Sequence, residues 1–106
     1  MRHGIQAAAV LLLALTLAGS AFAQSVGAGL YQAKCASCHG ADGLAATPMG
    51  KSMKVLSFKD PKMLSASDAR FVLTTMNGEN KMPAYKGKLT DEQIKQVVAF
   101  IRTLQK

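Results

Sequence analysis

Two cysteines that are separated by two residues and followed directly by a histidine constrain this chain more than any other feature. They form the segment CASCH at residues 35–39; the chain has no other cysteine, and its only other histidine is His3. The chain is 106 residues long and begins with a removable-looking leader, so the remaining domain can bury only a small core. Domains of this size usually need a disulfide, a metal or a cofactor for stability. We expect the two thiols and the imidazole to provide this additional stabilisation.

The spacing C-x-x-C-H predicts covalent attachment of a c-type haem. Cys35 and Cys38 lie three positions apart, on one helical turn, so each thiol can add to one of the two vinyl groups at a haem edge. His39 follows the second thiol and is thereby held beneath the iron as its proximal ligand. The sequence therefore predicts one covalently bound haem c per chain.

Three other uses of the motif fit the sequence less well. A structural zinc site needs four ligands, and too few remain once His3 leaves with the leader. A thioredoxin-like dithiol would lie in a βαβ pattern, which is not visible here. A disulfide between Cys35 and Cys38 would close a very small loop and so would restrict the unfolded chain little.

The first 23 residues have the parts of a secretion signal. A basic start precedes an apolar run at residues 7–17, and the small-x-small pattern at residues 21–23 predicts cleavage after Ala23. The alternative is a retained anchor, but the apolar stretch is shorter than the roughly 20 residues that a spanning helix needs. We expect an exported, periplasmic protein with no permanent membrane anchor and one domain over residues 24–106.

Apolar periodicity predicts helices and no sheet, and therefore an all-α fold. The first helix is expected from about Gly27 to Ala36. The second is expected to begin at a cap on Ser65 paired with Asp68, and to end at Asn77-Gly78. The apolar stripe of this second helix is expected to consist of Ala69, Val72, Leu73 and Met76.

The third helix is the most clearly marked. Thr90 and Gln93 form a capping box, and Leu89 and Ile94 occupy the two positions of a hydrophobic staple. Its apolar stripe runs through Ile94, Val97, Val98, Ile101 and Leu104. These local signals predict both where the helix begins and which face it buries.

Glycine and proline punctuate the two connections, residues 40–62 and 78–88, which we expect to be loops wrapped around a bound group. A methionine in one of them is the expected second ligand of the iron. Met82 is favoured, because it directly precedes Pro83, whose fixed φ stiffens the backbone. The other methionines after the leader are Met49, Met53, Met63 and Met76.

Those four methionines have simpler interpretations. Met76 lies on an apolar helical stripe and Met63 just before that helix, so both are expected to pack in the core. Met49 and Met53 lie in the long connection, where they could pack on the haem or wall its pocket. The pattern alone does not exclude them as ligands.

The chain resembles the small class I c-type cytochromes, monohaem electron carriers that include the c-551, c-553 and c6 types. The resemblance covers residues 27–104, and the segment GENKMPAY at residues 78–85 is similar to the methionine-ligand loop of that family. It implies the cytochrome c fold, with three main helices, in which the N- and C-terminal helices cross and the haem packs between helices and loops.

The resemblance also implies particular contacts. Gly27 and Tyr31 are expected to pack on the last helix, at Val97 and Phe100. His39 and Met82 are implied as the two axial ligands of the iron. Pro48 is the candidate whose carbonyl oxygen accepts a hydrogen bond from the other ring nitrogen of His39.

With both axial positions filled, no position on the iron is open to a substrate. The sequence therefore predicts an exported one-electron carrier and not an enzyme. Two alternatives stay open. One is a small cytochrome subunit of a larger oxidoreductase complex, and the other is a haem enzyme or sensor with an open iron face.

The chain is basic, with 13 lysines and arginines against 6 acidic residues and a formal charge of +7. Lysines bracket both ligand segments, at Lys34, Lys81, Lys86 and Lys88. They predict docking on acidic surfaces of redox partner proteins, weakened by salt. The same lysines would equally serve solubility. We expect a monomer, and no nucleic-acid partner, because aromatic and basic residues are not interleaved.

Overall fold

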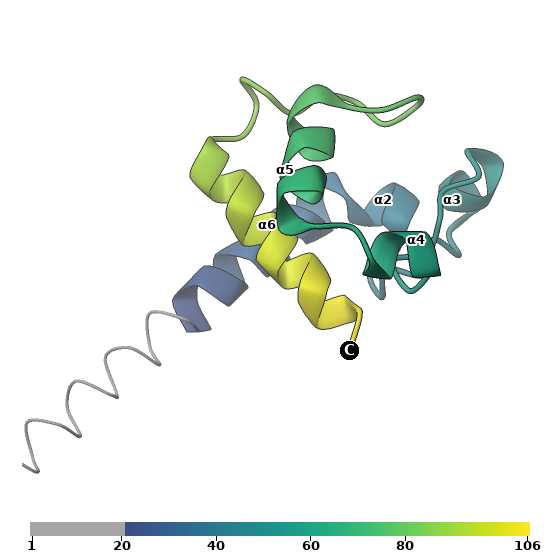
Figure 1. Cartoon of the computed structure of the whole chain (residues 1–106), viewed down its shortest axis with the longest axis horizontal. Coiled ribbons are helices and arrows are strands. Elements are labelled where there is room, and N and C mark those ends of the chain that lie inside the picture. The colour runs from purple at the N-terminus through teal and green to yellow at the C-terminus, as the bar shows by residue number, and fades with distance from the viewer. Residues whose placement is uncertain (1–20) are drawn as a thin grey trace, which may run out of the picture.

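The computed structural model describes residues 21–106, which form helices joined by loops (Figure 1). The predicted leader therefore lies almost wholly outside the described residues. Within residues 21–106 there is no β-strand, and the isolated bridges are Glu79–Met82 and Lys86–Leu89. The expected all-α fold is confirmed. None of the helices in this part of the chain is long and apolar enough to cross a membrane.

The first helical segment differs from its expected bounds. Residues 21–34 are helical, Cys35 interrupts the helix, and α2 follows at Ala36–His39. The interruption arises because Cys35 has φ −120° and ψ −33°, outside the usual helical range. The CxxCH motif therefore spans a break in the helix instead of the end of a continuous one.

The last helix, α6 at Asp91–Leu104, begins as predicted. The Thr90 hydroxyl accepts from the Gln93 amide, and the Gln93 side chain accepts from the Thr90 amide, which completes the capping box. Leu89 and Ile94 are both buried in the same core cluster. The buried residues of α6 are Ile94, Val97, Val98 and Ile101. The cap is confirmed, and so is the stripe as far as Ile101; Leu104, its last expected member, is only partly buried against the core.

The first described helix and α6 cross, as Figure 1 shows. A Cβ atom at Gly27 would overlap the backbone of Gln96, so glycine allows the two helices to approach this closely. The rings of Tyr31 and Phe100 lie 5.2 Å apart, and both Tyr31 and Val97 are only 1% exposed. The expected packing of Gly27 and Tyr31 on the last helix is confirmed.

The predicted cap of the second helix was wrong. α5 spans Asp68–Asn77, and its N-cap is Ser67, whose hydroxyl accepts from the Arg70 amide at 3.1 Å. Ser65 has near-helical dihedral angles, φ −85° and ψ −12°, and ends the preceding helix instead. An N-cap needs the extended backbone that Ser67 has, with ψ 160°.

The predicted buried face of α5 was also partly wrong. Phe71 and Thr75 are the buried residues of this helix, whereas Leu73 is 53% exposed and Ala69 is also exposed. Phe71 offers more apolar area than the alanine from which the stripe was counted. Thr75 can be buried because its hydroxyl donates to the Phe71 carbonyl at 2.8 Å. Val72 and Met76 pack at the edge of the core, as expected.

The connection expected as a loop over residues 40–62 contains one short helix and the start of a second. α3 spans Pro48–Ser52 and α4 spans Pro61–Leu64. Each begins with a side-chain cap, Thr47 or Asp60, followed by proline at the first helical position. Residues 78–88 contain no helix, as expected.

Candidate haem-binding site

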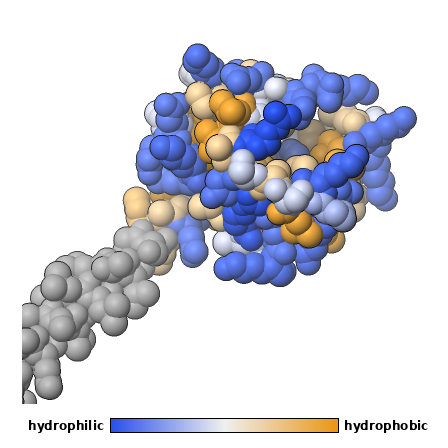
Figure 2. All heavy atoms as spheres, in the orientation of Figure 1, coloured by the Kyte–Doolittle hydropathy of each residue, from blue (hydrophilic) through white to orange (hydrophobic). Residues whose placement is uncertain are grey.

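A cavity of about 390 Å³ opens between the CxxCH motif and the loops. Figure 2 shows the surface hollowed on this face, with hydrophobic and hydrophilic residues around the opening. Its walls come from the motif segment, from residues 53–56 after α3, from α4, and from α5 with the loop that follows it. The lining includes Cys35, Cys38, His39 and Met82, so one cavity brings together the predicted attachment and ligand residues.

The two thiols are separate and partly buried. Cys35 and Cys38 do not form a disulfide with each other. Burial, and secondarily the neighbouring Cys38, raises the pKa of the Cys35 thiol to about 11. Within the described residues, no three His, Cys, Asp or Glu side chains gather as a bare metal ion would require. The arrangement therefore suits two-point attachment better than chelation of an ion.

The His39 ring is held by its neighbours. It stacks on Phe58, with ring centroids 4.7 Å apart and an interplanar angle of 13°, and Phe58 is itself only 3% exposed. Burial lowers the pKa of His39, which favours the neutral imidazole that binds metals. Nδ1 is buried without a hydrogen-bond partner, and the His39 residue lines the cavity.

The hydrogen bond expected between His39 and the Pro48 carbonyl is not formed in this structure, since Nδ1 has no partner. Pro48 is the first residue of α3, where a helical carbonyl is directed toward later amides of its own helix. Its role toward His39 stays a prediction.

Hydrogen bonds fix α2 against its surroundings. The Thr47 hydroxyl donates to the Ser37 carbonyl at 2.7 Å and accepts from the Gly50 amide, which joins α2 to α3. The Tyr31 hydroxyl donates to the Gly40 carbonyl at 2.6 Å, just beyond the motif. These bonds position the turn that carries both thiols and the imidazole.

The structure reduces the number of methionines that can reach the cavity. Met53, Met63 and Met82 line it. Met76 packs against the core and Met49 is 47% exposed, and neither lines the cavity. Sequence alone left Met49 and Met53 as alternatives to Met82, and of these two only Met53 lines the cavity; Met76 packs against the core, as expected. The choice among the three that remain is a prediction.

Comparison with known proteins identifies the family. Residues 23–101 match the family described as cytochrome C oxidase, cbb3-type, subunit III. The cytochrome c6 of Nostoc sp. is 39% identical over 75 residues, which cover 71% of this chain and 65% of that relative. The cytochrome c6 of Thermosynechococcus vestitus is 36% identical over 94 residues, 89% of this chain and 81% of the relative. The chain belongs to the small class I c-type cytochromes.

The fold of the cytochrome is also that of a solved relative. The structure of the KustC0563 c-type cytochrome superposes with a TM-score of 0.69 at 33% identity, over 76% of this chain and 98% of that chain. This family implies haem c, and the cavity fits it: two free thiols, a neutral imidazole and thioether sulfurs all line one space.

Two contributors to the site of the cytochrome were missed from the sequence. Phe58, which stacks on His39, lies 19 positions away in a connection expected to be irregular. Tyr85 was noted only as the end of the methionine-loop segment, yet its hydroxyl donates to the Lys34 carbonyl at 2.8 Å. Burial raises the pKa of Tyr85, so this hydroxyl keeps its proton. For Tyr85, the sequence signal that could have been used was an aromatic residue shortly after Met82-Pro83.

Charged side chains at the cavity are mostly basic. Lys34, Lys54 and Lys81 line it together with Glu79. Glu79 is paired with Arg70 at 3.3 Å, at an exposed site where such a pair contributes little stability. Lys34 and Lys81, two of the lysines expected to bracket the ligand segments, thus line the cavity.

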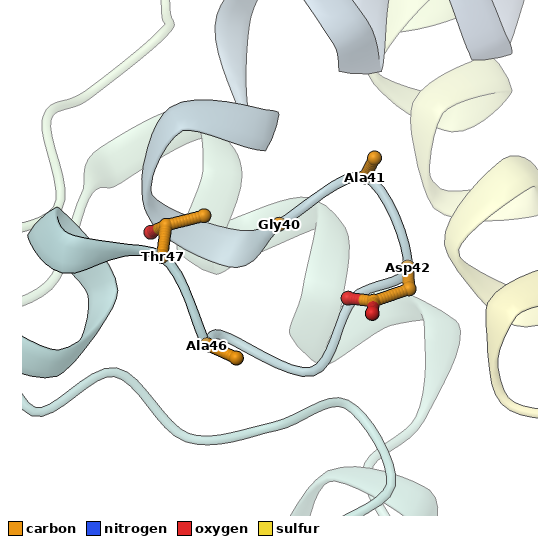
Figure 3. Close-up of a pocket in the computed structure, with 5 residues that line it drawn as sticks. All are labelled: Gly40, Ala41, Asp42, Ala46 and Thr47. Atoms are coloured by element: carbon orange, nitrogen blue, oxygen red, sulfur yellow. The ribbon is translucent and has the colours of Figure 1, made fainter.

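A second, smaller hollow lies beside the loop that follows α2 (Figure 3). It is lined by Gly40, Ala41, Asp42, Ala46 and Thr47. Its polar side chains already have partners within the domain, since Asp42 accepts from the Leu44 amide and Thr47 bonds to α2. It contains no thiol, imidazole or thioether, and so it is not the haem site.

Proposed function

We propose that this cytochrome is a one-electron carrier that holds one haem through thioether bonds from Cys35 and Cys38. His39 and Met82 are its axial ligands. The observation that most supports this proposal is the single cavity lined by both thiols, the imidazole and the Met82 side chain. Bound haem supplies an iron that changes oxidation state by one electron.

The residues around the cavity adapt it to this task. His39 binds as a neutral imidazole, oriented by its stacking on Phe58. A thioether ligand at Met82 raises the reduction potential relative to a second nitrogen ligand. Apolar walls at Val55 and Leu56 restrict water near the ring and tune the potential further. With both axial positions occupied by the chain, substrates are kept from the iron.

The proposal extends to location and partners. Residues 1–23 are a secretion signal removed after Ala23, and the carrier acts as a monomer in the periplasm. Lys34 and Lys81 at the cavity, with exposed Lys86 and Lys88 nearby in sequence, favour redox partners that have acidic docking surfaces. The cytochrome c6 relatives support the assignment as an electron carrier.

Replacement of single methionines tests the ligation. Met82→Ala is expected to abolish the weak far-red absorption band of methionine-ligated ferric haem, and to let the ferrous protein bind carbon monoxide quickly. Met53→Ala and Met63→Ala are matched controls, because both side chains also line the cavity, and both variants are expected to keep the band. Visible spectra with and without carbon monoxide measure both effects.

Other outcomes have a clear meaning. A band that persists in Met82→Ala and disappears in Met53→Ala or Met63→Ala would transfer the ligand role to that methionine. A wild-type protein with a high-spin ferric spectrum and rapid binding of carbon monoxide would refute the carrier. It would favour an enzyme or sensor with an open iron face.

A second candidate function has one specific observation in its favour. The matching family is described as a subunit of a cbb3-type cytochrome c oxidase, so this cytochrome could work as a subunit of a larger oxidoreductase. Purification from the native cell separates the two. A free carrier elutes at its monomer size, whereas a subunit co-purifies with stoichiometric partner chains.

A further inference from the structure

The helix that leads into the CxxCH motif has a carbonyl group that is not used within the helix. In a continuous α-helix the Lys34 carbonyl would accept from the Cys38 amide. At the break the Cys38 amide donates to the Cys35 carbonyl at 3.3 Å, and the His39 amide donates to the same oxygen at 3.0 Å. The Lys34 carbonyl is therefore left without its helical donor.

The Tyr85 hydroxyl takes the place of that donor. It donates to the Lys34 carbonyl at 2.8 Å, across a separation of 51 residues. Within residues 21–106, no other hydrogen bond joins residues 78–88 to the chain between residue 21 and His39. One side-chain bond therefore links the loop that carries Met82 directly to the haem attachment turn.

Tyr85 is itself firmly placed. Its amide donates to the Thr75 carbonyl at 3.0 Å, and its carbonyl accepts from the amides of Lys88 and Leu89. The Lys88 ammonium lies 5.8 Å from the centre of its ring. The backbone of Tyr85 is bonded to α5, and its hydroxyl is bonded to the segment before the motif. A displacement of one of these segments can therefore displace the other.

The segment before Tyr85 is compact. We call residues 78–84 the Met82 loop. Glu79 and Met82 exchange two backbone hydrogen bonds, at 3.2 and 2.9 Å. Gly78 has φ +73°, and a Cβ there would come within 2.6 Å of the Met82 carbonyl oxygen. A loop closed on itself in this way moves largely as one piece, so its attachment at Tyr85 affects Met82.

We propose that Tyr85 is a positioning residue, which ties the Met82 loop to the attachment turn and so limits how often the loop opens. The inference rests on the proposed ligation by Met82 for its effect at the iron. An added ligand can replace Met82 only when the loop opens, so its apparent affinity follows the open fraction. Loss of one hydrogen bond from the closed form raises that fraction about 2- to 10-fold.

Tyr85→Phe tests the tie, because it removes the hydroxyl and keeps the ring. In the haem-loaded protein we expect imidazole to bind the ferric form about 2- to 10-fold more tightly. We expect amide hydrogen exchange in the Met82 loop to accelerate by a similar factor. Thr103→Val is the matched control, since it also removes a hydroxyl bonded to a backbone carbonyl, at Phe100, and Thr103 does not line the cavity. It is expected to leave both quantities near wild type.

The outcomes distinguish this inference from the ligand assignment. If Tyr85→Phe changes neither exchange in the Met82 loop nor imidazole affinity, whatever its effect on the melting temperature, the tie is refuted. If loop exchange accelerates but imidazole affinity does not change, and Met82→Ala keeps its far-red band, the tie stands and the ligand assignment fails. Equal changes in Thr103→Val would also refute a specific role of Tyr85.

Discussion

Gly27 is a residue at which the packing of the cytochrome leaves no space for a side chain. A Cβ atom at this position would overlap the Gln96 carbonyl group, which belongs to the backbone of α6 and cannot rotate away. Gly29, two positions on, has no atom within 4 Å of where its Cβ would be. The two glycines lie in the same helix and differ mainly in this contact.

We therefore expect Gly27→Ala and Gly29→Ala to have opposite effects. Gly27→Ala should lower the free energy of unfolding by about 1–3 kcal/mol, as overpacking does. Gly29→Ala should leave it unchanged or raise it by up to about 1 kcal/mol, through better helix propensity. Denaturant titrations of the haem-loaded proteins measure both, and equal effects would mean that the close contact at Gln96 is not needed.

At this scale, the part of the site that is local in sequence could be predicted. Cys35, Cys38 and His39 lie within five positions, so their place together at one cavity could be expected from spacing alone. The bond from Tyr85 to Lys34 could not be predicted, because it depends on a break in the helix and on a partner 51 residues away. Met82 lies between these cases: its loop has a recognisable sequence, but Met53 and Met63 reach the same cavity.

Among the helices, α5 shows how a cap decides where an element begins. Ser67 has the extended backbone of an N-cap and its hydroxyl accepts from the Arg70 amide. Ser65 lies in the last turn of the preceding segment, where its hydroxyl donates to the Lys62 carbonyl at 3.3 Å. Both serines are exposed.

Paired substitutions check this assignment. Ser67→Ala should lower the free energy of unfolding by about 1 kcal/mol, because an orphan amide of α5 loses its acceptor. Ser65→Ala should change it by less than about 0.5 kcal/mol, as exposed substitutions usually do. Thermal unfolding of the two haem-loaded variants gives the comparison, and a larger loss in Ser65→Ala would restore Ser65 as the cap.

The helices differ in how much their sequence reveals. The start of α6 and most of its buried face were predicted, because Thr90, Gln93 and a regular apolar stripe mark them locally. In α5 the stripe was counted from small Ala69, whereas tertiary packing selected Phe71. The two short helices carried a cap followed by proline, at Thr47-Pro48 and Asp60-Pro61, but helices of four or five residues have too little periodicity to stand out.

For the whole molecule, the lysines at and near the Met82 segment can be separated from the total basic charge. Lys81 lines the cavity, and Lys86 and Lys88 are exposed shortly after it in the chain. Lys59, Lys95 and Lys106 are also exposed, do not line the cavity and lie outside residues 81–88. A redox partner could be attracted by the lysines near the cavity or by the net charge of the whole protein. These two explanations predict different results.

Replacement of Lys81, Lys86 and Lys88 together by glutamine should slow association with an acidic redox partner at low salt. Replacement of the control set, Lys59, Lys95 and Lys106, removes the same charge and should slow association much less. Both differences should shrink at high salt, where screening shortens the range of the field to about 3 Å at 1 M. Stopped-flow electron transfer measures the rates. Equal slowing by the two sets would mean that net charge alone, and not the position of the lysines, controls association.

The crossing at Gly27 has a consequence for the order in which the molecule is made. The contact joins the first described helix to α6, which ends at Leu104, close to the last residue of the sequence. A growing chain therefore contains the attachment motif long before it contains the surface on which Tyr31 packs. Such long-range contacts form only after the intervening loop has closed. A chain cut short before Gln96 would carry both thiols and the imidazole, but would lack the part of α6 that packs on the first helix.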